Sequence, residues 1–352
     1  MKKKIAILIV NYNGLRWLSD CLTSVLTTVQ PEIERDVYLV DNNSTDTSLA
    51  FVREQFPEVQ VIPLTENTGF AGGNNAGWRF IQQQSDCDYI MLLNEDARLT
   101  DSCLSVLADY LDNHETCAAV QPKLKLWPDT NRINSLGNVI HYLGFGYTSA
   151  NDVLDTNQIT TPQIINSCSG AAVMIRPEAV PLVGGLFADF MFMYLEDLDF
   201  GWRTMLAGWD SVVVPEAVVY HQYEFNRSLK QYYYFERNRL WILAQNYRLA
   251  TLILLLPAIL FMELGQLFFA WRNKSLQAKL QTYAWLLQPQ HLRELVQAHK
   301  RVVQLRRRTD RQLLSAFSGQ ILFQPLEGFL LRYVANPIFN TYLSLIRLII
   351  IW

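Results

Sequence analysis

The stretch Tyr89-Ile90-Met91-Leu92-Leu93-Asn94-Glu95-Asp96 decides the expected fold. Its first five residues are mainly apolar and predict a buried strand, and the next three are polar. Ligands of α/β proteins bind where such strands end. Carboxylates there can hold a hard divalent cation, and the cation can hold a phosphate. The alternative is a plain surface turn after a strand, and the rest of the chain has to decide between the two.

Other short apolar runs precede this stretch, and each ends in a polar or glycine-rich segment. Strands are predicted over residues 5–10, 37–40, 59–63 and 89–93. Apolar residues at helical spacing predict helices over residues 15–27, 49–55 and 76–84. This alternation predicts a mostly parallel sheet with helices on both faces. The predicted fold class is therefore α/β, with the chemistry at one edge of the sheet.

The pattern continues beyond this first half of the sheet. A helix is predicted over residues 102–113, and strands over residues 118–126, 169–175, 211–215 and 218–220. Residues 129–161 are rich in loops and are predicted to form a lid or an excursion on the acceptor side.

Composition narrows the class of protein. The chain has 352 residues and a formal net charge of −3, which argues against a dedicated nucleic-acid binder. Its five cysteines are scattered without CxxC spacing, so neither a disulfide framework nor a zinc site is expected. The apolar run near the N-terminus is too short for a signal peptide and is interpreted as the first strand.

Two polar segments at predicted strand ends suit a nucleotide. Asp41 can accept a hydrogen bond from a nucleobase N–H, whereas Asp46 fits a helix cap. Residues 66–75 contain three glycines and three asparagines, and such a backbone can approach a phosphate or a sugar closely. This segment lacks both the dinucleotide fingerprint and the Walker sequence. A simple tight turn is the alternative.

Carboxylates also gather at the start of a later helix. Glu196, Asp197 and Asp199 could simply complement the helix dipole. Asp197, however, follows an apolar segment, and a carboxylate beside such a wall can have a raised pKa and act as a general base. Asp199 and Arg203 are predicted to form a structural pair. His221 ends a strand, and the separate acidic site makes it a plausible metal ligand rather than an ordinary surface histidine.

Taken together, seven segments resemble the inverting nucleotide-sugar glycosyltransferases of family 2, which have the GT-A fold. The nearest branch is the rhamnosyltransferase-like enzymes of bacterial polysaccharide assembly. The segments lie in the family's order within residues 5–240, and they are Val10-Asn11-Tyr12-Asn13-Gly14, Val40-Asp41-Asn42-Asn43-Ser44-Thr45-Asp46, Asn67-Thr68-Gly69-Phe70-Ala71-Gly72-Gly73-Asn74-Asn75, Leu92-Leu93-Asn94-Glu95-Asp96, Ser169-Gly170-Ala171-Ala172, Glu196-Asp197-Leu198-Asp199 and His221.

The resemblance implies roles for individual residues. Asp197 would be the catalytic base, and Asp96 with His221 would bind Mg²⁺ or Mn²⁺. Contacts with the nucleotide-sugar donor are implied for Asn11, Tyr12, Asn13, Asp41, Asn43, Asn67, Gly69, Gly72, Asn74, Asn94 and Gly170. Acceptor binding or support is implied for Glu196, Asp199 and Arg203.

The sequence departs from the family pattern in two places. Asn94 stands where the first aspartate of a DxD site is expected, and Glu95 stands where proline is common. Asp96 is therefore predicted to be the principal metal ligand. Ala188-Asp189 follows Phe187 where Asp-Glu is more usual, which leaves the acceptor side open.

The composition changes after residue 228. Residues 1–228 are predicted to form the GT-A domain, and residues 229–352 a helical, basic and apolar membrane-associating region. Residues 249–271 are apolar and long enough to span a bilayer, but Pro257, Glu263 and Gln266 interrupt them. Residues 272–311 contain ten lysines and arginines against two acids, a net charge of +8. We therefore expect a helix lying in the cytoplasmic leaflet, with the basic segment on anionic headgroups.

Alternatives for this region are a true span, or a helical cap on the catalytic domain or on a second copy of the chain. The function implied is transfer of rhamnose from dTDP-rhamnose, or of a hexose from a UDP-linked donor, to a glycan on a polyprenyl diphosphate lipid. The expected place is the cytoplasmic face of the inner membrane, with a homo-oligomer possible. A sugar nucleotidyltransferase and a non-catalytic glycan-binding pseudoenzyme are the competing functions.

Overall fold

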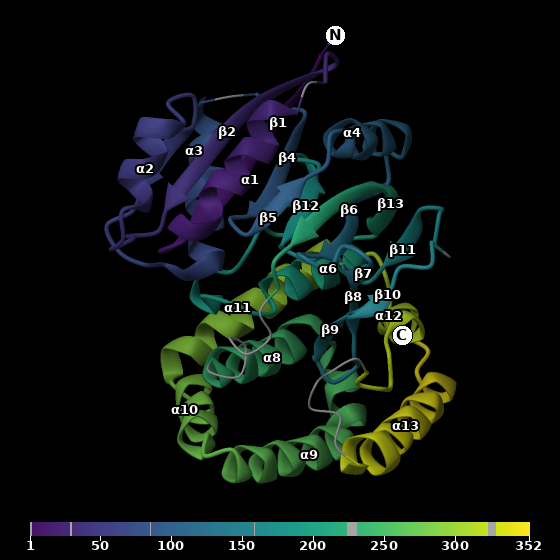
Figure 1. The fold of residues 1–352 in the computed structure, drawn as a ribbon. Helices are drawn as coiled ribbons and strands as arrows, with labels where there is room; N and C mark the ends of the chain where they lie inside the picture. Colours follow the sequence, from purple (N-terminus) through teal and green to yellow (C-terminus); the bar gives the residue numbers. More distant parts are fainter. Residues whose placement is uncertain (1, 29, 85, 158, 224–230, 323–328) are drawn as a thin grey trace.

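The computed structural model describes residues 2–28, 30–84, 86–157, 159–223, 231–322 and 329–352. The chain forms a mixed α/β sheet flanked by helices, with further helices gathered at one end of it (Figure 1). The predicted boundary at residue 228 lies outside the described residues. Among the described residues, the first helix beyond it is α8 (Tyr232–Asn246).

The strands of the main sheet occur in the spatial order β10-β7-β6-β12-β4-β1-β2-β3, and β13 pairs with β5, β6 and β11. The pairs β1–β2, β1–β4, β2–β3 and β6–β13 are parallel. The strands are β1 (Lys3–Asn11), β2 (Ile33–Asp41), β3 (Gln60–Pro63), β4 (Tyr89–Asn94), β5 (Ala97–Leu99), β6 (Cys117–Leu126), β7 (Arg132–Ser135), β10 (Val153–Leu154), β11 (Gln163–Ile165), β12 (Ala172–Ile175) and β13 (Asp210–His221). A separate hairpin consists of β8 (Asn138–Ile140) and β9 (Gly146–Thr148).

Strand β4 lies between β1 and β12, and its first five residues are buried. A strand covered on both faces needs a continuous apolar run, which the sequence provides. Helices α1 (Leu15–Thr27), α2 (Ser48–Gln55) and α4 (Cys103–Asn113) contribute to the core on one face of the sheet. Helices α3 (Gly69–Gln84) and α6 (Glu196–Leu206) contribute to the core on the other face.

Residues 129–161 are rich in loops, as expected, and they also contain the short strands β7 to β10. Two other expectations about secondary structure are corrected. The two short strands expected between residues 211 and 220 form the single strand β13, which has a bulge between Val214 and Val218. The glycine-rich segment is helical from Gly69 onward. Its glycines allow α3 to lie close to the sheet, since a Cβ on Gly77 would be 2.3 Å from Leu8 Cδ1.

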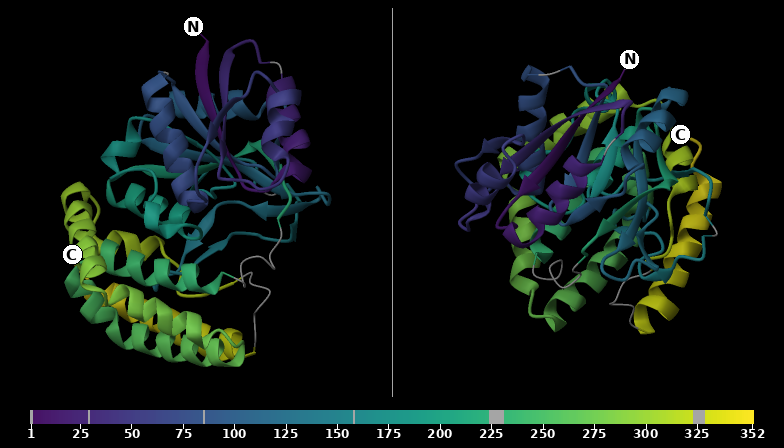
Figure 2. Two further views of the ribbon diagram at one scale, coloured as in Figure 1. Left: turned by 90° about the vertical axis from the view of Figure 1, so that its left-hand side faces the viewer. Right: turned by 45° about the horizontal axis from the view of Figure 1, so that its top comes forward.

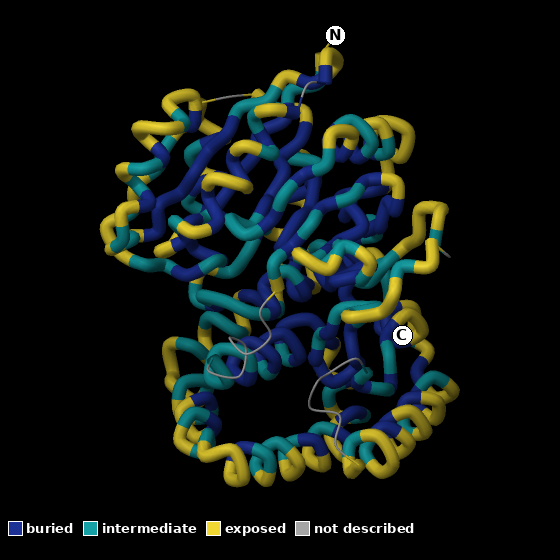
Figure 3. The backbone as a smooth tube through the Cα atoms, viewed as in Figure 1, coloured by how far each residue is buried: buried dark blue, intermediate teal, exposed yellow. Residues whose placement is uncertain are grey.

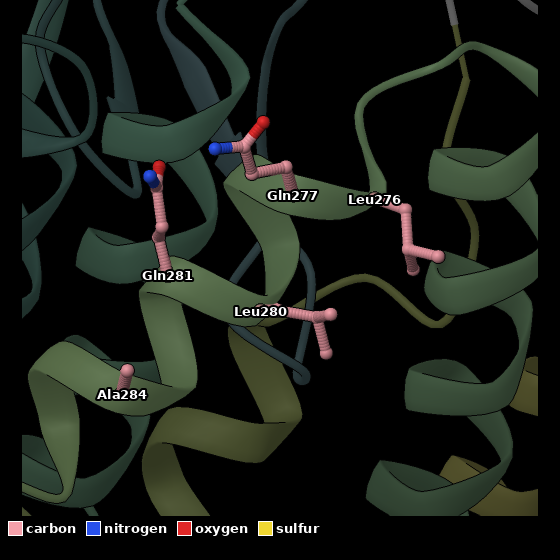
Figure 4. A pocket seen from close by; sticks show the side chains of 5 residues that line it. All are labelled: Leu276, Gln277, Leu280, Gln281 and Ala284. Carbon is pink, nitrogen blue, oxygen red and sulfur yellow. The ribbon is translucent and has the colours of Figure 1, made fainter.

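The C-terminal helices form a curved layer beyond the sheet (Figures 1 and 2). They are α8, α9 (Leu249–Arg272), α10 (Leu276–Leu286), α11 (Pro289–Leu305), α12 (Asp310–Ala316) and α13 (Asn336–Ile349). Their apolar residues share a core with α6, including the fully buried Trp202. A hollow on α10 belongs to this layer, with Leu276 and Leu280 on one side and Gln277 and Gln281 on the other (Figure 4).

A buried ion cluster joins α8 to α9 and α10. Arg239 donates to both carboxylate oxygens of Glu236 at 2.9 Å and also bonds Glu263, while Lys279 donates to Glu263 Oε2 at 2.7 Å. Burial alone would raise the pKa of Glu263, but Arg239 and Lys279 hold it down to about 2. The expectation that Glu263 interrupts the apolar helix as an uncompensated charge is therefore wrong. The same cluster uses Lys279, so the basic segment presents fewer free charges than its sequence suggests.

Candidate functional site

The ends of three parallel strands meet at one edge of the sheet. Asn11 is in register with Asp41, and Val10 with Asn94. Nδ2 of Asn11 lies 3.1 Å from Asp41 Oδ1 and 3.0 Å from Ser48 Oγ, and it is fully buried. Asp41 also accepts from the backbone N–H of Ser44 at 3.3 Å. The structure thus places the predicted residues Asn11, Asp41 and Asn94 at one edge of the sheet, and Asn11 holds Asp41 in place.

The loops after β1 and β2 are tied to each other. Oδ1 of Asn13 accepts from the backbone N–H of Thr45 at 2.7 Å, and both Asn13 and Asn43 have positive φ. Tyr12 is 46% exposed, so its ring is accessible to a ligand. Asp46 accepts from the backbone N–H of Ser48 at 3.0 Å, in keeping with its predicted role at a helix start.

The glycine-rich segment contributes mainly packing. Oδ1 of Asn67 accepts from the N–H of Gly69 at 2.9 Å, and buried Asn74 donates to the carbonyl oxygen of Phe70 at 2.9 Å. A Cβ on Gly72 would meet Thr68, and one on Gly69 would meet the carbonyl oxygen of Phe192 at 2.3 Å. Asn67 and Asn74, which the resemblance assigns to the donor, thus each make a hydrogen bond within the protein as well.

Asp96 and His221 face each other although they are 125 positions apart. Nε2 of His221 lies 3.2 Å from Asp96 Oδ1, and both side chains are largely buried. Nδ1 of His221 lies 2.8 Å from Asn134 Oδ1. In the neutral ring this fixes the hydrogen on Nδ1, so Nε2 presents its lone pair toward the carboxylate. Among the described residues, Asp96 Oδ1 has no well-aligned hydrogen-bond donor.

This arrangement fits a divalent cation. Two acceptors 3.2 Å apart repel each other unless a positive charge is near both. The spacing also matches two neighbouring ligands that each lie about 2.1 Å from one ion. No group of three or more His, Cys, Asp or Glu side chains suited to a metal occurs within the described parts of the chain. The protein therefore offers two ligands here, and oxygens of a bound diphosphate would have to supply others.

Asp197 lies at the start of α6 and is held by three donors. Its Oδ2 accepts from Asn138 Nδ2 and from the N–H of Gly170, both at 3.0 Å, and its Oδ1 accepts from the N–H of Leu198 at 2.7 Å. Burial raises the pKa of Asp197, and these hydrogen bonds oppose the rise. Gly170 thus contacts the predicted base through its backbone.

The neighbouring Glu196 has a different environment. Burial, followed by the charge of Asp197, raises the pKa of Glu196 well above its usual range. Its Oε2 has no hydrogen-bond partner among the residues that the structure describes. Asp197 accepts three hydrogen bonds that stabilise a carboxylate, and burial beside the charge of Asp197 favours the protonated form of Glu196.

Asp199 and Arg203 form the predicted pair at 2.7 Å. Arg203 also donates to the carbonyl oxygens of Val183 and Gly185, at 2.6 and 2.8 Å. Asp199 Oδ1 accepts from Gln245 at 2.9 Å and from Asn246 at 3.1 Å, both on α8. The pair supports α6 from inside the protein.

The sequence matches the glycosyl transferase family 2 domain over residues 6–180, which include all of the strand ends described above except that of β13. The chain belongs to glycosyl transferase family 2. The family is one of glycosyltransferases, and the chain has the predicted α/β fold.

Curated relatives of the family 2 enzyme agree with this assignment. It is 28% identical over 207 residues to an N-acetylglucosaminyl-diphospho-decaprenol L-rhamnosyltransferase of Mycobacterium tuberculosis, covering 53% of this chain and 66% of the relative. It is 23% identical over 218 residues to a poly-beta-1,6-N-acetyl-D-glucosamine synthase of Staphylococcus epidermidis, covering 61% and 48%. The chain thus aligns with slightly less than two thirds of the first relative's length.

Two solved structures share the fold of the family 2 enzyme. GalNAc-T7 with UDP, GalNAc and Mn²⁺ has a TM-score of 0.57 at 14% identity, covering 70% of this chain and 49% of that one. TarS residues 1–349 of S. aureus has a TM-score of 0.50 at 15% identity, covering 100% and 93%. At these identities the likeness is one of fold.

Sequence reasoning missed several residues of this site. Asn134 orients His221, and Asn138 binds Asp197, but both lie in the segment that was predicted to be a loop-rich excursion. Asn238 and Arg237 on α8 contact the segment before Asp197. An asparagine between two arginines in an otherwise aromatic and apolar helix was the available signal for Asn238.

Proposed function

We propose that the family 2 enzyme transfers rhamnose from dTDP-rhamnose, with inversion, to a glycan on a polyprenyl diphosphate lipid. The observation that carries this proposal is the Asp96–His221 pair, placed at the same sheet edge as Asp41 and with its second imidazole nitrogen fixed by Asn134. The rhamnosyltransferase name of the M. tuberculosis relative supports the choice of sugar and of lipid-linked acceptor. A UDP-linked hexose is the alternative donor.

Asp197 supplies the base for a single displacement. Its carboxylate takes the proton of the acceptor hydroxyl, and the oxygen forms a bond to the anomeric carbon on the face opposite the diphosphate. The bond between that carbon and the diphosphate oxygen breaks, and the nucleoside diphosphate leaves. Burial raises the pKa of Asp197, which makes its carboxylate a stronger base than an exposed one.

Asp41 and the loops after β1 and β2 would bind the nucleoside, and Asp96 with His221 would hold Mg²⁺ or Mn²⁺. When bound, the cation would neutralise the charge that accumulates on the leaving diphosphate. The family assignment favours this reaction over a sugar nucleotidyltransferase or a pseudoenzyme.

A donor panel tests the proposal. Purified enzyme is incubated with dTDP-rhamnose, UDP-glucose, UDP-N-acetylglucosamine or UDP-galactose, with Mg²⁺, Mn²⁺ or EDTA, and release of nucleoside diphosphate is measured. We expect turnover to be fastest with dTDP-rhamnose and to be lost in EDTA. Equal turnover in EDTA, or turnover of a UDP-linked donor alone, would contradict the metal or the donor assignment.

We also propose that α9 lies in the surface of a membrane. Its exposed positions are all apolar between its first residue and Trp271, whereas Thr251 and Glu263 face the protein. A helix on a water-exposed surface has the opposite arrangement, with polar residues outside and apolar residues toward the protein. Only 17% of its most apolar 18-residue window is buried. Among the described residues it is the one helix long and apolar enough to cross a membrane, by length and composition alone.

Neighbouring helices extend this apolar face. Figure 3 shows exposed positions along the outer side of α9 and α13, away from the sheet. Exposed large apolar side chains on these helices are Leu249, Ile253, Leu256, Leu260, Phe261, Leu264, Phe268, Trp271, Ile338, Leu345, Leu348 and Ile349. Exposed Arg248, Arg272 and Lys274 lie at the two ends of α9, where they can meet anionic headgroups.

The basic segment, residues 272–311, has fewer cations available to bind a bilayer than its sequence suggested. Lys279 is buried in the ion cluster, Arg306 pairs with Asp310, and Arg308 pairs with Asp210. Helix α11 runs back toward the sheet, so its cations lie apart from the outer side of α9 (Figure 1). The apolar face therefore provides most of the membrane affinity in this proposal.

Vesicle flotation tests the membrane face. Leu260→Glu combined with Leu264→Glu places two charges on the outer side of α9, and we expect at least about a tenfold loss of binding to phosphatidylglycerol vesicles because charge is costly in the apolar layer. The matched control is Ile164→Glu with Leu182→Glu, two exposed apolar residues of the catalytic part.

Flotation of the α9 variant at wild-type level would overturn this assignment. Sedimentation of the protein without vesicles distinguishes the two possible partners of the apolar face of α9, which are a bilayer and a second copy of the chain. If a second copy covers α9, the wild type is a dimer in water, the α9 variant is a monomer, and neither floats.

A further inference from the structure

The backbone immediately before Asp197 has an unfavourable conformation. Phe192 has φ 61° and ψ −65°, and the N–H of Met193 donates to the carbonyl oxygen of Met191 at 2.6 Å, which defines a strained three-residue turn. Tyr194 and Leu195 also have positive φ, at 69° and 65°. Such conformations are unfavourable for residues other than glycine and persist only where their surroundings enforce them. Residues 191–195 therefore need an external restraint.

Asn238 on α8 supplies that restraint. Its Nδ2 lies 2.9 Å from the carbonyl oxygen of Met191, 3.1 Å from that of Met193 and 2.8 Å from that of Tyr194. Asn238 is fully buried. The two N–H groups of one amide are thus shared among carbonyl groups on both sides of the strained turn, and an apolar side chain of the same shape could donate to none of them.

The opposite side of the turn rests against the start of α3. The carbonyl oxygen of Phe192 accepts from the N–H of Ala71 at 3.1 Å, and Gly69 has no side chain to separate the two segments. The Phe192 ring stacks on Tyr234 of α8, with ring centroids 4.8 Å apart. The turn is therefore held between α8 and the glycine-rich helix start.

We infer that Asn238 is a positioning residue for the base, acting through the backbone of residues 191–195. This inference rests on the proposed role of Asp197. Helix α6 begins directly after Leu195, so a change in the turn rotates the first residues of that helix. Such a rotation moves Asp197 away from Asn138 and Gly170, which together hold its Oδ2. No substrate contact by Asn238 is needed for this effect.

The test compares Asn238→Leu with Asn336→Leu. Asn336 is also buried, and it also bonds backbone groups, those of Ile321, but it lies on α13. With dTDP-rhamnose as donor, we expect Asn238→Leu to lower kcat by about 10²-fold, the loss that a misplacement of roughly 1 Å can cause. The KM for dTDP-rhamnose should stay close to the wild-type value.

The pH dependence of kcat provides a measurement that a loss of folding stability alone would not change. Burial raises the pKa of Asp197 by more than its hydrogen bonds lower it, so release of the carboxylate into water, which removes both effects, lowers that pKa toward its ordinary value. The acidic limb of kcat should therefore shift to lower pH in Asn238→Leu and stay in place in Asn336→Leu. A loss of kcat with an unmoved limb, or equal kinetic effects of the two variants, would overturn the inference.

Hydrogen–deuterium exchange tests the restraint without any activity. Exchange at residues 191–198 should rise in Asn238→Leu and not in Asn336→Leu, even if no donor in the panel is turned over. Inactive wild-type enzyme with this exchange result would contradict the proposed function while keeping the restraint. Wild-type exchange at residues 191–198 in Asn238→Leu would reject the restraint itself.

Discussion

Asp197→Asn is expected to lower kcat for transfer by about 10³-fold, within the range that a positioned general base contributes. The carboxylate is the only part of Asp197 that can accept the acceptor's proton, and an amide cannot replace it. Affinity for dTDP or UDP should change little, because the predicted nucleoside contacts lie on the loops after β1 and β2. Single-turnover transfer and calorimetric titration with each nucleotide measure the two quantities.

The substitution also has a structural cost that has to be separated from the chemical one. Both oxygens of Asp197 accept hydrogen bonds, so the amide group of asparagine leaves a donor unpaired, at a cost of roughly 1–3 kcal/mol. The matched control is Asp210→Asn, at the opposite end of β13 from His221, where the carboxylate pairs with Arg308. Asp197→Asn with more than a tenth of wild-type activity, at a temperature where it is folded, would rule out the assigned base.

Asp96→Asn is expected to weaken Mn²⁺ binding and to abolish most activity. The substitution replaces a charged ligand with a neutral one beside His221. Loss of a residue that only hydrogen-bonds a metal ligand typically lowers metal affinity about 10- to 100-fold. We expect a larger fall in Mn²⁺ affinity for Asp96→Asn, measured by electron paramagnetic resonance in the presence of dTDP. Asn134→Ala removes such a residue beside His221 and should give a smaller loss.

The control for this series is Asp88→Asn, just before the other end of β4, where the carboxylate accepts from the backbone N–H of Lys4 at 2.7 Å. It should bind Mn²⁺ and dTDP like the wild type. Unchanged Mn²⁺ affinity in Asp96→Asn would mean that the cation binds elsewhere or not at all, whatever the activity of that variant.

The strand ends could be predicted from sequence because the controlling pattern is local. The apolar run from Tyr89 and the polar residues after it are adjacent in the chain, and parallel pairing then puts Asn11, Asp41 and Asn94 at one edge. The pairing of Asp96 with His221 depends on contacts between distant segments. The residues alone suggested only that His221 could join the acidic site as a metal ligand, and the family resemblance named Asp96 as its partner.

Other parts of the site depend on packing that no local pattern shows. The glycines within residues 66–75 suggested a close approach to a phosphate or a sugar, and the structure shows a packing role that the sequence did not indicate: Gly69 lets the start of α3 approach the Phe192 turn, and Gly73 lets the helix approach Val10 of the sheet. From the sequence, Glu263 was an unpaired charge within an apolar helix. Its partners Arg239 and Lys279 could not be foreseen because they lie on two other helices. Asn134, Asn138 and Asn238 were missed for the same reason: each acts on a residue more than 40 positions away.

One turn of α8 contacts both the C-terminal helices and the backbone before Asp197. Glu236 and Arg239 join the ion cluster with α9 and α10, while Asn238, between them in sequence, bonds the backbone before Asp197. The catalytic part is therefore not a self-contained module. A chain cut after residue 228 would keep every residue with a proposed chemical role and lose the amide that restrains residues 191–195. A chimaera that joins this N-terminal part to the C-terminal half of another protein would have to retain α8.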